Sequence, residues 1–204
     1  TAKLKSKTRS DIEVTSIYFQ DQIDVSDRLK LMIGGRHDTF DITVADIKSG
    51  TSQSREDKEF SPRAGVIFKP SENVSWYYSY SESFLPRSGE QYKKLTASAA
   101  ALDPDVYESS EFGVKIAISE SLSFAAAYFD SEQTIATRDA SGEGAEIVGL
   151  QVDGLELELK GKVNDKMSLV VGYSSMDGKT SSGGEPREIP EYTLSLFATY
   201  EVSD

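Results

Sequence analysis

Histidine and cysteine, the side chains that most often carry out catalysis or bind transition metals, are nearly absent from this sequence. His37 is the single histidine among 204 residues, and there is no cysteine. The lack of cysteine excludes disulfide scaffolds, cysteine-based zinc sites and thiol catalysis. A hydrolase needs a base held against a nucleophile or a water, and His37 is the only candidate. Because His37 and Asp38 are adjacent, their side chains would point to opposite faces of a strand, so we expect no catalytic or metal site and no enzyme.

Two carboxylates, Glu156 and Glu158, alternate with leucines in the stretch LELEL and therefore share one face of a strand. Such a pair can hold a cation, but a solvated strand face accounts for it more simply. The glycine-rich stretches 142–144 and 182–184 lack the following helix that a phosphate cradle needs, so they are expected to be loops.

Residues 86–105 are the one polar stretch with a composition suited to binding. Arg87, Lys93 and Lys94 lie close to Tyr92 in a chain whose net charge is −12. Cations offset the charge of an anionic ligand, and an aromatic ring gives it a surface for stacking. The alternative is that these side chains simply solvate an exposed loop. The acidic composition also argues against a nucleic-acid partner, which needs clustered Lys and Arg.

Apolar and polar residues alternate along most of the chain. A small acidic turn is followed by this alternation at 26–31, 71–80, 119–124 and 164–169. Period-two alternation is typical of a strand with one apolar face. That face is expected to contact lipid or detergent and contains Leu29, Leu31, Val74, Trp76, Leu122, Phe124, Leu155 and Leu157. The opposite face is expected to be wet and to carry Arg36, Asp38, Arg63, Lys115, Asp153, Glu156, Glu158 and Lys160.

The alternation and the turn signals predict an all-β chain of about nine antiparallel strands. Their expected ranges are 12–25, 28–43, 58–69, 74–85, 106–118, 122–136, 147–162, 167–178 and 190–202. One end of the sheet has tight turns at 26–28, 71–73, 119–121 and 164–166, and the other has long polar loops at 44–57, 86–105, 137–146 and 179–189.

Alternation alone does not distinguish a soluble antiparallel sheet from a transmembrane β-barrel, because it does not say which face is wet. The expected strands are about 12 residues or longer, against the usual five or six. Short turns at one rim, long loops at the other and aromatic residues toward the strand ends are typical of outer-membrane barrels. No apolar run approaches the ~20 residues of a spanning helix, so the sequence does not predict one. We therefore favour a transmembrane β-barrel.

Several ordered stretches resemble the middle and later barrel of TonB-dependent outer-membrane siderophore receptors. They are SIYFQDQI at 16–23, LMIGGRHDTFD at 31–41, FSPRAG at 60–65, YSYSESFLP at 78–86, EFGVK at 111–115 and GLELE at 154–158. Together they cover nearly the whole chain. His37 is a departure, since family members usually have an aromatic residue between the Arg and the Asp. Within the family, 89–92, 95–96 and 102–104 most resemble receptors for catecholate siderophores.

The resemblance implies a 22-stranded barrel with a plug domain inside it. Residues 1–204 would then be an internal part of the barrel domain, with the plug and the remaining strands outside this chain. It also implies the outer membrane of a Gram-negative bacterium, contact with outer-membrane lipid, import powered by the TonB-ExbB-ExbD complex, and a ferric siderophore as transported ligand, with no covalently bound cofactor. Arg87, Tyr92, Lys93 and Lys94 are the expected ligand-binding residues. The alternatives are haem, cobalamin or a glycan as cargo, or a small closed barrel of about eight to ten strands with an adhesin or structural role.

Overall fold

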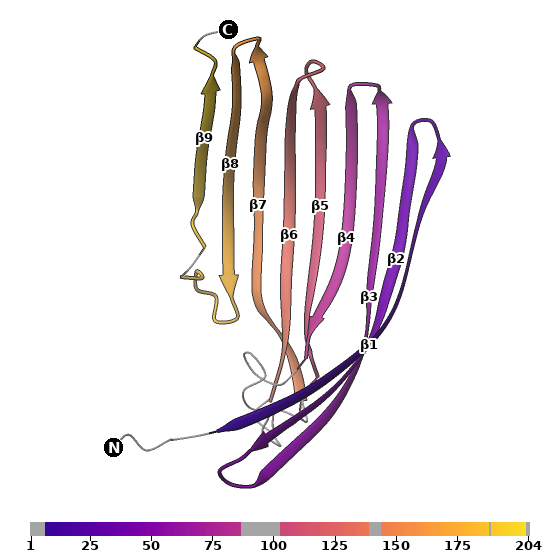
Figure 1. The fold of residues 1–204 in the computed structure, drawn as a ribbon, viewed down its shortest axis with the longest axis vertical. Helices are drawn as coiled ribbons and strands as arrows, with labels where there is room; N and C mark the ends of the chain where they lie inside the picture. The colour runs from indigo at the N-terminus through magenta and orange to yellow at the C-terminus, as the bar shows by residue number, and fades with distance from the viewer. Residues whose placement is uncertain (1–6, 87–102, 139–143, 188, 203–204) are drawn as a thin grey trace.

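The chain forms a single antiparallel sheet in which each strand pairs with the next one along the sequence. The computed structural model describes residues 7–86, 103–138, 144–187 and 189–202, and within them the sheet has nine strands in the order β1 to β9 (Figure 1). The strands are β1 (Thr8–Ser26), β2 (Leu29–Asp46), β3 (Thr51–Ser71), β4 (Val74–Leu85), β5 (Asp105–Ala117), β6 (Leu122–Arg138), β7 (Gly144–Asn164), β8 (Met167–Thr180) and β9 (Tyr192–Tyr200). The predicted antiparallel nine-strand order is confirmed.

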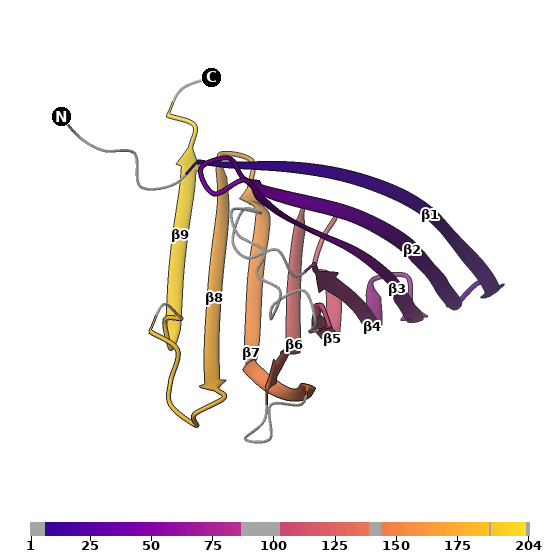
Figure 2. The same cartoon turned by 90° about the horizontal axis from the view of Figure 1, so that it is seen from below.

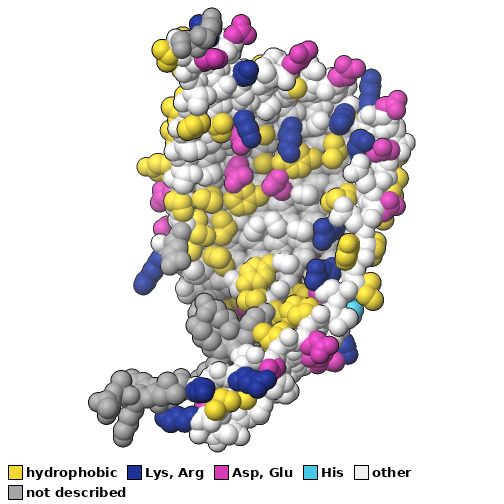
Figure 3. All heavy atoms as spheres, in the orientation of Figure 1, with side chains coloured by type: hydrophobic (Ala, Val, Ile, Leu, Met, Phe, Trp, Pro, Cys, Tyr) yellow, Lys and Arg dark blue, Asp and Glu magenta, His cyan; other side chains and the backbone are white. Residues whose placement is uncertain are grey.

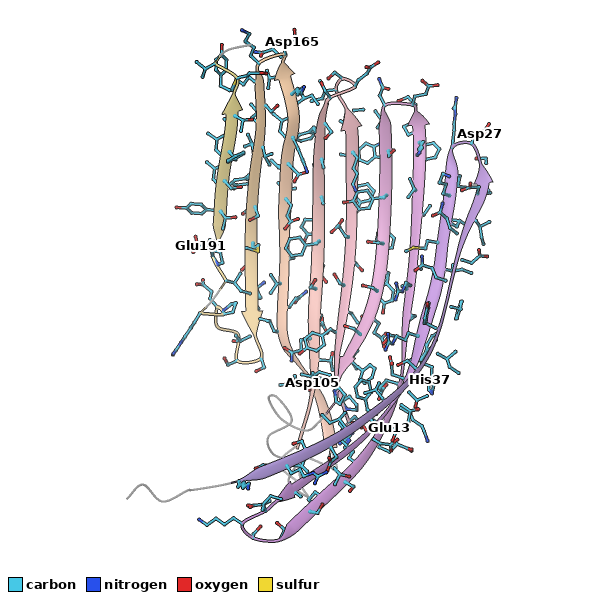
Figure 4. All side chains as sticks on the ribbon, in the orientation of Figure 1. Glu13, Asp27, His37, Asp105, Asp165 and Glu191 are labelled. Carbon is cyan, nitrogen blue, oxygen red and sulfur yellow. The ribbon has the colours of Figure 1, made fainter. Side chains whose placement is uncertain are left out.

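Side chains that accept hydrogen bonds from the backbone form the tight turns at one end of the sheet. The Leu29 amide donates to Ser26 Oγ at 3.1 Å, and the Leu122 amide donates to Ser119 Oγ at 3.1 Å. At a third turn the Lys166 amide donates to the Asn164 side-chain oxygen at 3.0 Å. Short polar side chains favour turns for this reason, which explains why the same small motif recurs. Asp27 and Asp165, in two of these turns, lie at the same end of the sheet (Figure 4).

The strand register divides the side chains into two continuous faces. Across β4 to β7, Trp76 pairs with Val114, Val114 with Ala126, and Ala126 with Leu157. The next such row runs from Tyr78 through Phe112 and Tyr128 to Leu155. We call this side the outward face. The side that holds Tyr77, Ser79 and their cross-strand partners is the concave face.

The sheet has almost no buried apolar core among the described residues, where Ile42 and Val44 are the only buried hydrophobic side chains. Large apolar side chains are instead exposed along the outward face, and Leu194 and Leu196 each expose 71% of their surface. A soluble monomer rarely exposes contiguous apolar patches larger than a few hundred Å². The described residues contain no helix long and apolar enough to cross a bilayer. The exposed outward face fits immersion in lipid.

The sheet is curved but open. Figure 2 shows the curvature and shows β1, β2 and β3 sweeping across one side of the sheet. In the described part of the chain β1 pairs only with β2, and β9 pairs only with β8. Both edge strands therefore keep a row of unpaired backbone groups, which is costly in a membrane. The arrangement fits a segment of a larger barrel and disagrees with a small closed barrel of eight to ten strands.

The loop predicted at 44–57 is wrong. β2 continues to Asp46, and β3 already begins at Thr51, so only a four-residue turn separates the two strands. The polar composition of 51–57 suggested a loop, but the backbone ladder continues through it, as in the pairing of Thr43 with Ser54. The predicted loop at 137–146 shortens as well, because β6 reaches Arg138 and β7 starts at Gly144; the residues between them lie outside the described ranges.

The ends of β2 and β3 extend, together with the first half of β1, beyond β4 to β9, because β3 pairs with β4 only from Arg63 onward. This extension, residues 35–46 and 51–62, contains one largely buried ion pair and another in which only the aspartate is buried. Arg55 Nε lies near Asp57 Oδ1 at 2.5 Å, and both side chains are largely buried. Arg36 Nε donates to Asp38 Oδ1 at 2.8 Å. A 5.4 Å edge-to-face contact between Phe40 and Phe84 joins the extension to the end of β4.

We expect charge to be tolerated differently on the two faces. Leu157→Arg places a cation on the outward face, where it should cost about 2–4 kcal/mol if that level lies at mid-membrane depth. Ser79→Arg places the same charge on the concave face and should cost less. The measurement is the yield of heat-modifiable, folded full-length protein. Equal yields for the two variants would contradict a bilayer on the outward side.

The extension also predicts a pH-dependent stability. Burial, together with the negative charges of Asp57, Asp103 and Glu82, raises the pKa of Glu59 above its ordinary 4.5. A carboxyl with a raised folded-state pKa destabilises the fold while it is charged, and this cost disappears as the pH falls through that pKa. Glu59→Gln should therefore raise the unfolding temperature at neutral pH, and the gain should shrink in acid.

The matched control for that variant is Glu56→Gln. Glu56 is exposed and lies 2.6 Å from Lys58 Nζ, so neutralising it removes an attraction and should lower stability slightly at neutral pH. Thermal unfolding of both variants across an acid-to-neutral pH series distinguishes the two cases. A Glu59→Gln variant less stable than the parent at neutral pH would show that Glu59 is stabilised as the anion.

Candidate functional site

The concave face carries charged side chains at two levels. Nearest the short turns lies a row of lysines from β2, β3, β5 and β7: Lys30, Lys69, Lys115, Lys160 and Lys162. Figure 3 shows Lys and Arg side chains in a row across the upper part of one face, with Asp and Glu side chains below them. Because the positive and negative side chains lie at different levels, the electrostatic potential of this face changes along the direction of the strands.

The second level is a group of carboxylates around an open hollow of about 380 Å³. Glu111, Glu156 and Glu158 line it, together with small residues of β6, β8 and β9. Glu158 is opposite Ala125 and Gly172, and Glu156 is opposite Ala127 and Ser174. Because these neighbours are small, Glu156 and Glu158 have room to receive cationic groups from a partner in the interior.

Tyr77 separates the two levels. Its hydroxyl donates to Glu111, and Lys115 Nζ lies 5.2 Å from the centre of its ring. The ring lies across Gly113, where an added Cβ would come within 2.5 Å of it. A glycine at 113 therefore allows Tyr77 to lie against the sheet rather than project from it.

Most of the residues predicted for the wet face share the concave side of the sheet. Arg36 pairs with Ser61, Lys115 with Ser75, and Glu158 with Ala125, all on the concave side. Asp153 is a correction, because it pairs with Asp130 and accepts a hydrogen bond from Tyr128 Oη at 2.9 Å on the outward face. It has the same parity along β7 as Leu155, so strict alternation would have placed it correctly.

His37 lies on the outward face, between Ile17 on β1 and Phe60 on β3. Asp38 points the other way, toward Ser16 and Arg36, as the sequence predicts. Figure 4 shows His37 well away from the short turns. Within the described ranges no group of three or more His, Asp or Glu side chains has the arrangement needed to hold a metal ion.

The four ligand-binding residues predicted from sequence, Arg87, Tyr92, Lys93 and Lys94, lie outside the described residues. Their assignment stays a prediction. Sequence reasoning missed the hollow beside the lysine row, because its residues come from separate strands and meet only through the inter-strand register.

The arrangement has the properties of a passage wall. One face is apolar and exposed, and the other carries banded charges, serine-rich strands and open hollows. The wall can orient charged groups that lie against it, and a closed sheet built on it would enclose a water-filled space.

Comparison with known proteins also supports a barrel wall. The sequence matches the family described as TonB dependent receptor-like, beta-barrel, over residues 3–204. The probable TonB-dependent siderophore receptor PiuA of Acinetobacter baumannii is 26% identical over 94% of this chain and 30% of that protein. The ferrichrome outer membrane transporter/phage receptor of Escherichia coli is 28% identical over 93% of this chain and 26% of that protein. The chain thus spans between 26% and 30% of the length of these two relatives.

Solved structures share the fold. The crystal structure of PiuA superposes with a TM-score of 0.82 at 26% identity, covering 96% of this chain and 32% of that chain. The ferric-catecholate import receptor Fiu of Escherichia coli superposes with a TM-score of 0.85 over 97% of this chain and 33% of that chain, and its 17% identity supports the fold alone. The match over nearly the full length, the antiparallel nine-strand order and the exposed apolar face lead to one conclusion: the chain belongs to the TonB-dependent receptor β-barrel family of the Gram-negative outer membrane.

Proposed function

We propose that this chain forms part of the barrel wall of a receptor that takes up a ferric siderophore across the outer membrane. The observation that carries the proposal is the family match over residues 3–204, together with a relative whose printed name is a probable siderophore receptor. The proposed role of the wall is to separate lipid from a polar passage and to present charged side chains to the molecules inside the barrel. No reaction is catalysed.

The energy source and the plug are proposed to lie outside these residues. The chain spans only 30% of PiuA, so residues 1–204 are proposed to be one part of a longer barrel domain. The plug and the remaining strands would complete the receptor, and the TonB-ExbB-ExbD complex would power import. The carboxylates Glu111, Glu156 and Glu158 are suited to contact cationic side chains of such a plug.

The proposed cargo is a catecholate-type chelate. A ferric tris-catecholate is strongly anionic and aromatic, and Arg87, Lys93, Lys94 and Tyr92 supply cations and an aromatic ring within a single stretch of sequence. Relatives include a ferrichrome transporter and a ferrioxamine receptor, so other chelates are the principal competing cargoes. Haem, cobalamin and glycans are further competitors.

The cargo assignment predicts a salt-dependent loss of affinity. Replacing Arg87, Lys93 and Lys94 with Ser in the full-length receptor should weaken ferric-catecholate binding, by up to about 1 kcal/mol for each exposed cation. The residual binding should also depend less on salt, because added ions screen the attraction that these residues supply. The measurement is fluorescence-quench titration of purified receptor at low and at high salt.

A charge-matched control is the triple change of Lys160, Lys162 and Lys166 to Ser, which removes the same charge near the short turns. It should leave the dissociation constant within about twofold, because at physiological ionic strength charges more than ~8 Å apart are largely screened. Unchanged affinity in the loop variant at both salt concentrations would remove 86–105 from the site. Preferential binding of cobalamin or haem by the parent protein would refute the siderophore assignment itself.

A further inference from the structure

A second hollow lies on the concave face, closer to the short turns than the first, with Tyr77 lining both. It measures about 330 Å³ and is formed by β2, β3, β4 and β5, with Gln22 contributed by β1. Met32, Ile67 and Tyr77 give it an apolar floor, and Lys30, Lys69 and Lys115 contribute to its lining. A separate hollow at the same level is lined by Lys160, Val170 and Phe197; the present one differs in having the Tyr77 ring with Lys115 over it.

The hollow is built by the register of the sheet. Lys30 is directly opposite Ile67, which is opposite Tyr77, so one row of side chains crosses three strands. In the adjacent row Met32 is opposite Gly65, and its Cε would lie 3.5 Å from a Cβ added there. Met32 lies over the glycine and forms part of the floor, and the Tyr77 ring lies on the side of the hollow toward β5.

The three lysines give the hollow an excess of positive charge. Lys30 Nζ forms an ion pair with Asp24 Oδ1 at 2.8 Å. Asp24 also interacts electrostatically with Lys69, so one carboxylate faces two of the lysines, whereas Lys115 lies over the Tyr77 ring. Glu111 is the nearest carboxylate to the ring, and it is engaged by the Tyr77 hydroxyl.

Short turns face the periplasm in outer-membrane barrels, and the hollow lies near them. We propose that it is an exit-side binding site for an aromatic anion, namely a catecholate arm of the ferric chelate as it leaves the passage. The inference rests on the proposed function. An apolar floor with an aromatic ring takes a planar ring, and the surrounding ammonium groups take its charged oxygens. A neutral hydroxamate chelate would gain little from three lysines. The positive charge of the site would attract an anionic chelate, whereas the negative charges of Glu111, Glu156 and Glu158 would repel it.

The test separates capture at the cell surface from passage through the barrel. The full-length receptor carries Lys30→Gln, Lys69→Gln and Lys115→Gln together. Binding of radiolabelled ferric tris-catecholate is measured on energy-depleted cells on ice, and the initial uptake rate is measured on energised cells. We expect the surface affinity to stay within about twofold of that of the parent. The uptake rate should fall about tenfold, because each exposed cation contributes little to binding but three of them act on one ligand here.

Two controls make the result specific. Lys160→Gln with Lys162→Gln removes charge from the same level but outside this hollow, and uptake should stay near the parent rate. Replacing the three lysines with Arg keeps the charge and should restore most of the uptake. The amount of heat-modifiable receptor in each strain corrects for variants that fold poorly.

Three outcomes would overturn the proposal. One is an uptake rate equal to that of the parent. Another is a variant whose uptake per folded receptor is unchanged but which becomes leaky to unrelated solutes or loses thermal stability. In that case the three lysines would bind an acidic segment of protein rather than the chelate. The third is a parent receptor that binds no ferric catecholate on ice; it would refute the proposed cargo at the binding step, before uptake is measured, and this site with it.

Discussion

Backbone hydrogen bonding is the constraint on which the rest of this structure depends. In hydrocarbon each unpaired N–H or C=O group costs several kcal/mol, so a strand is stable there only between two other strands. The ladder from β1 to β9 satisfies this condition for seven interior strands, since only the two edge strands have a single neighbour. The same ladder fixes which side chains share a row. The positions of charge, aromatic rings and hollows all follow from that register, because a slip by one residue would exchange the two faces.

The register aligns the apolar residues of neighbouring strands, so that a weak alternation within one strand becomes a continuous apolar row across the sheet. In one strand, Trp76 alternating with Ser75 and Tyr77 says little about the surroundings. Across the sheet, Trp76 joins Val114, Ala126 and Leu157 in an unbroken apolar row, while Tyr77 and Lys115 lie on the other side. Burying such a row against lipid is favourable at about 25 cal/mol per Å² of apolar surface. The absence of a conventional core in the described residues follows from this, since the apolar groups that would form one face outward instead.

Much of this fold was predictable from the sequence, and the failures have physical causes. The turns were found because Ser26, Ser119 and Asn164 accept backbone hydrogen bonds, which is a local property of the chain. The 44–57 stretch was assigned to a loop because its residues are polar, yet β3 begins at Thr51. Over 51–57 of β3 the alternation is absent while the ladder persists, although the paired part of β2 still alternates at Phe40, Ile42 and Val44. Hydrophobic periodicity therefore does not mark the whole length of every strand.

The site was less predictable than the fold, because it depends on pairing between strands far apart in sequence. Lys30 and Tyr77 are separated by most of two hairpins, yet they lie at the ends of one row through Ile67. Glycines at 65 and 113 reinforce the effect, since each leaves space that the side chain opposite it fills. A sequence shows the lysines, the tyrosine and the glycines separately, and only the register shows that they form a single hollow. In a barrel wall, then, the alternation along a strand determines which side faces water, and the pairing between strands determines where that side can bind.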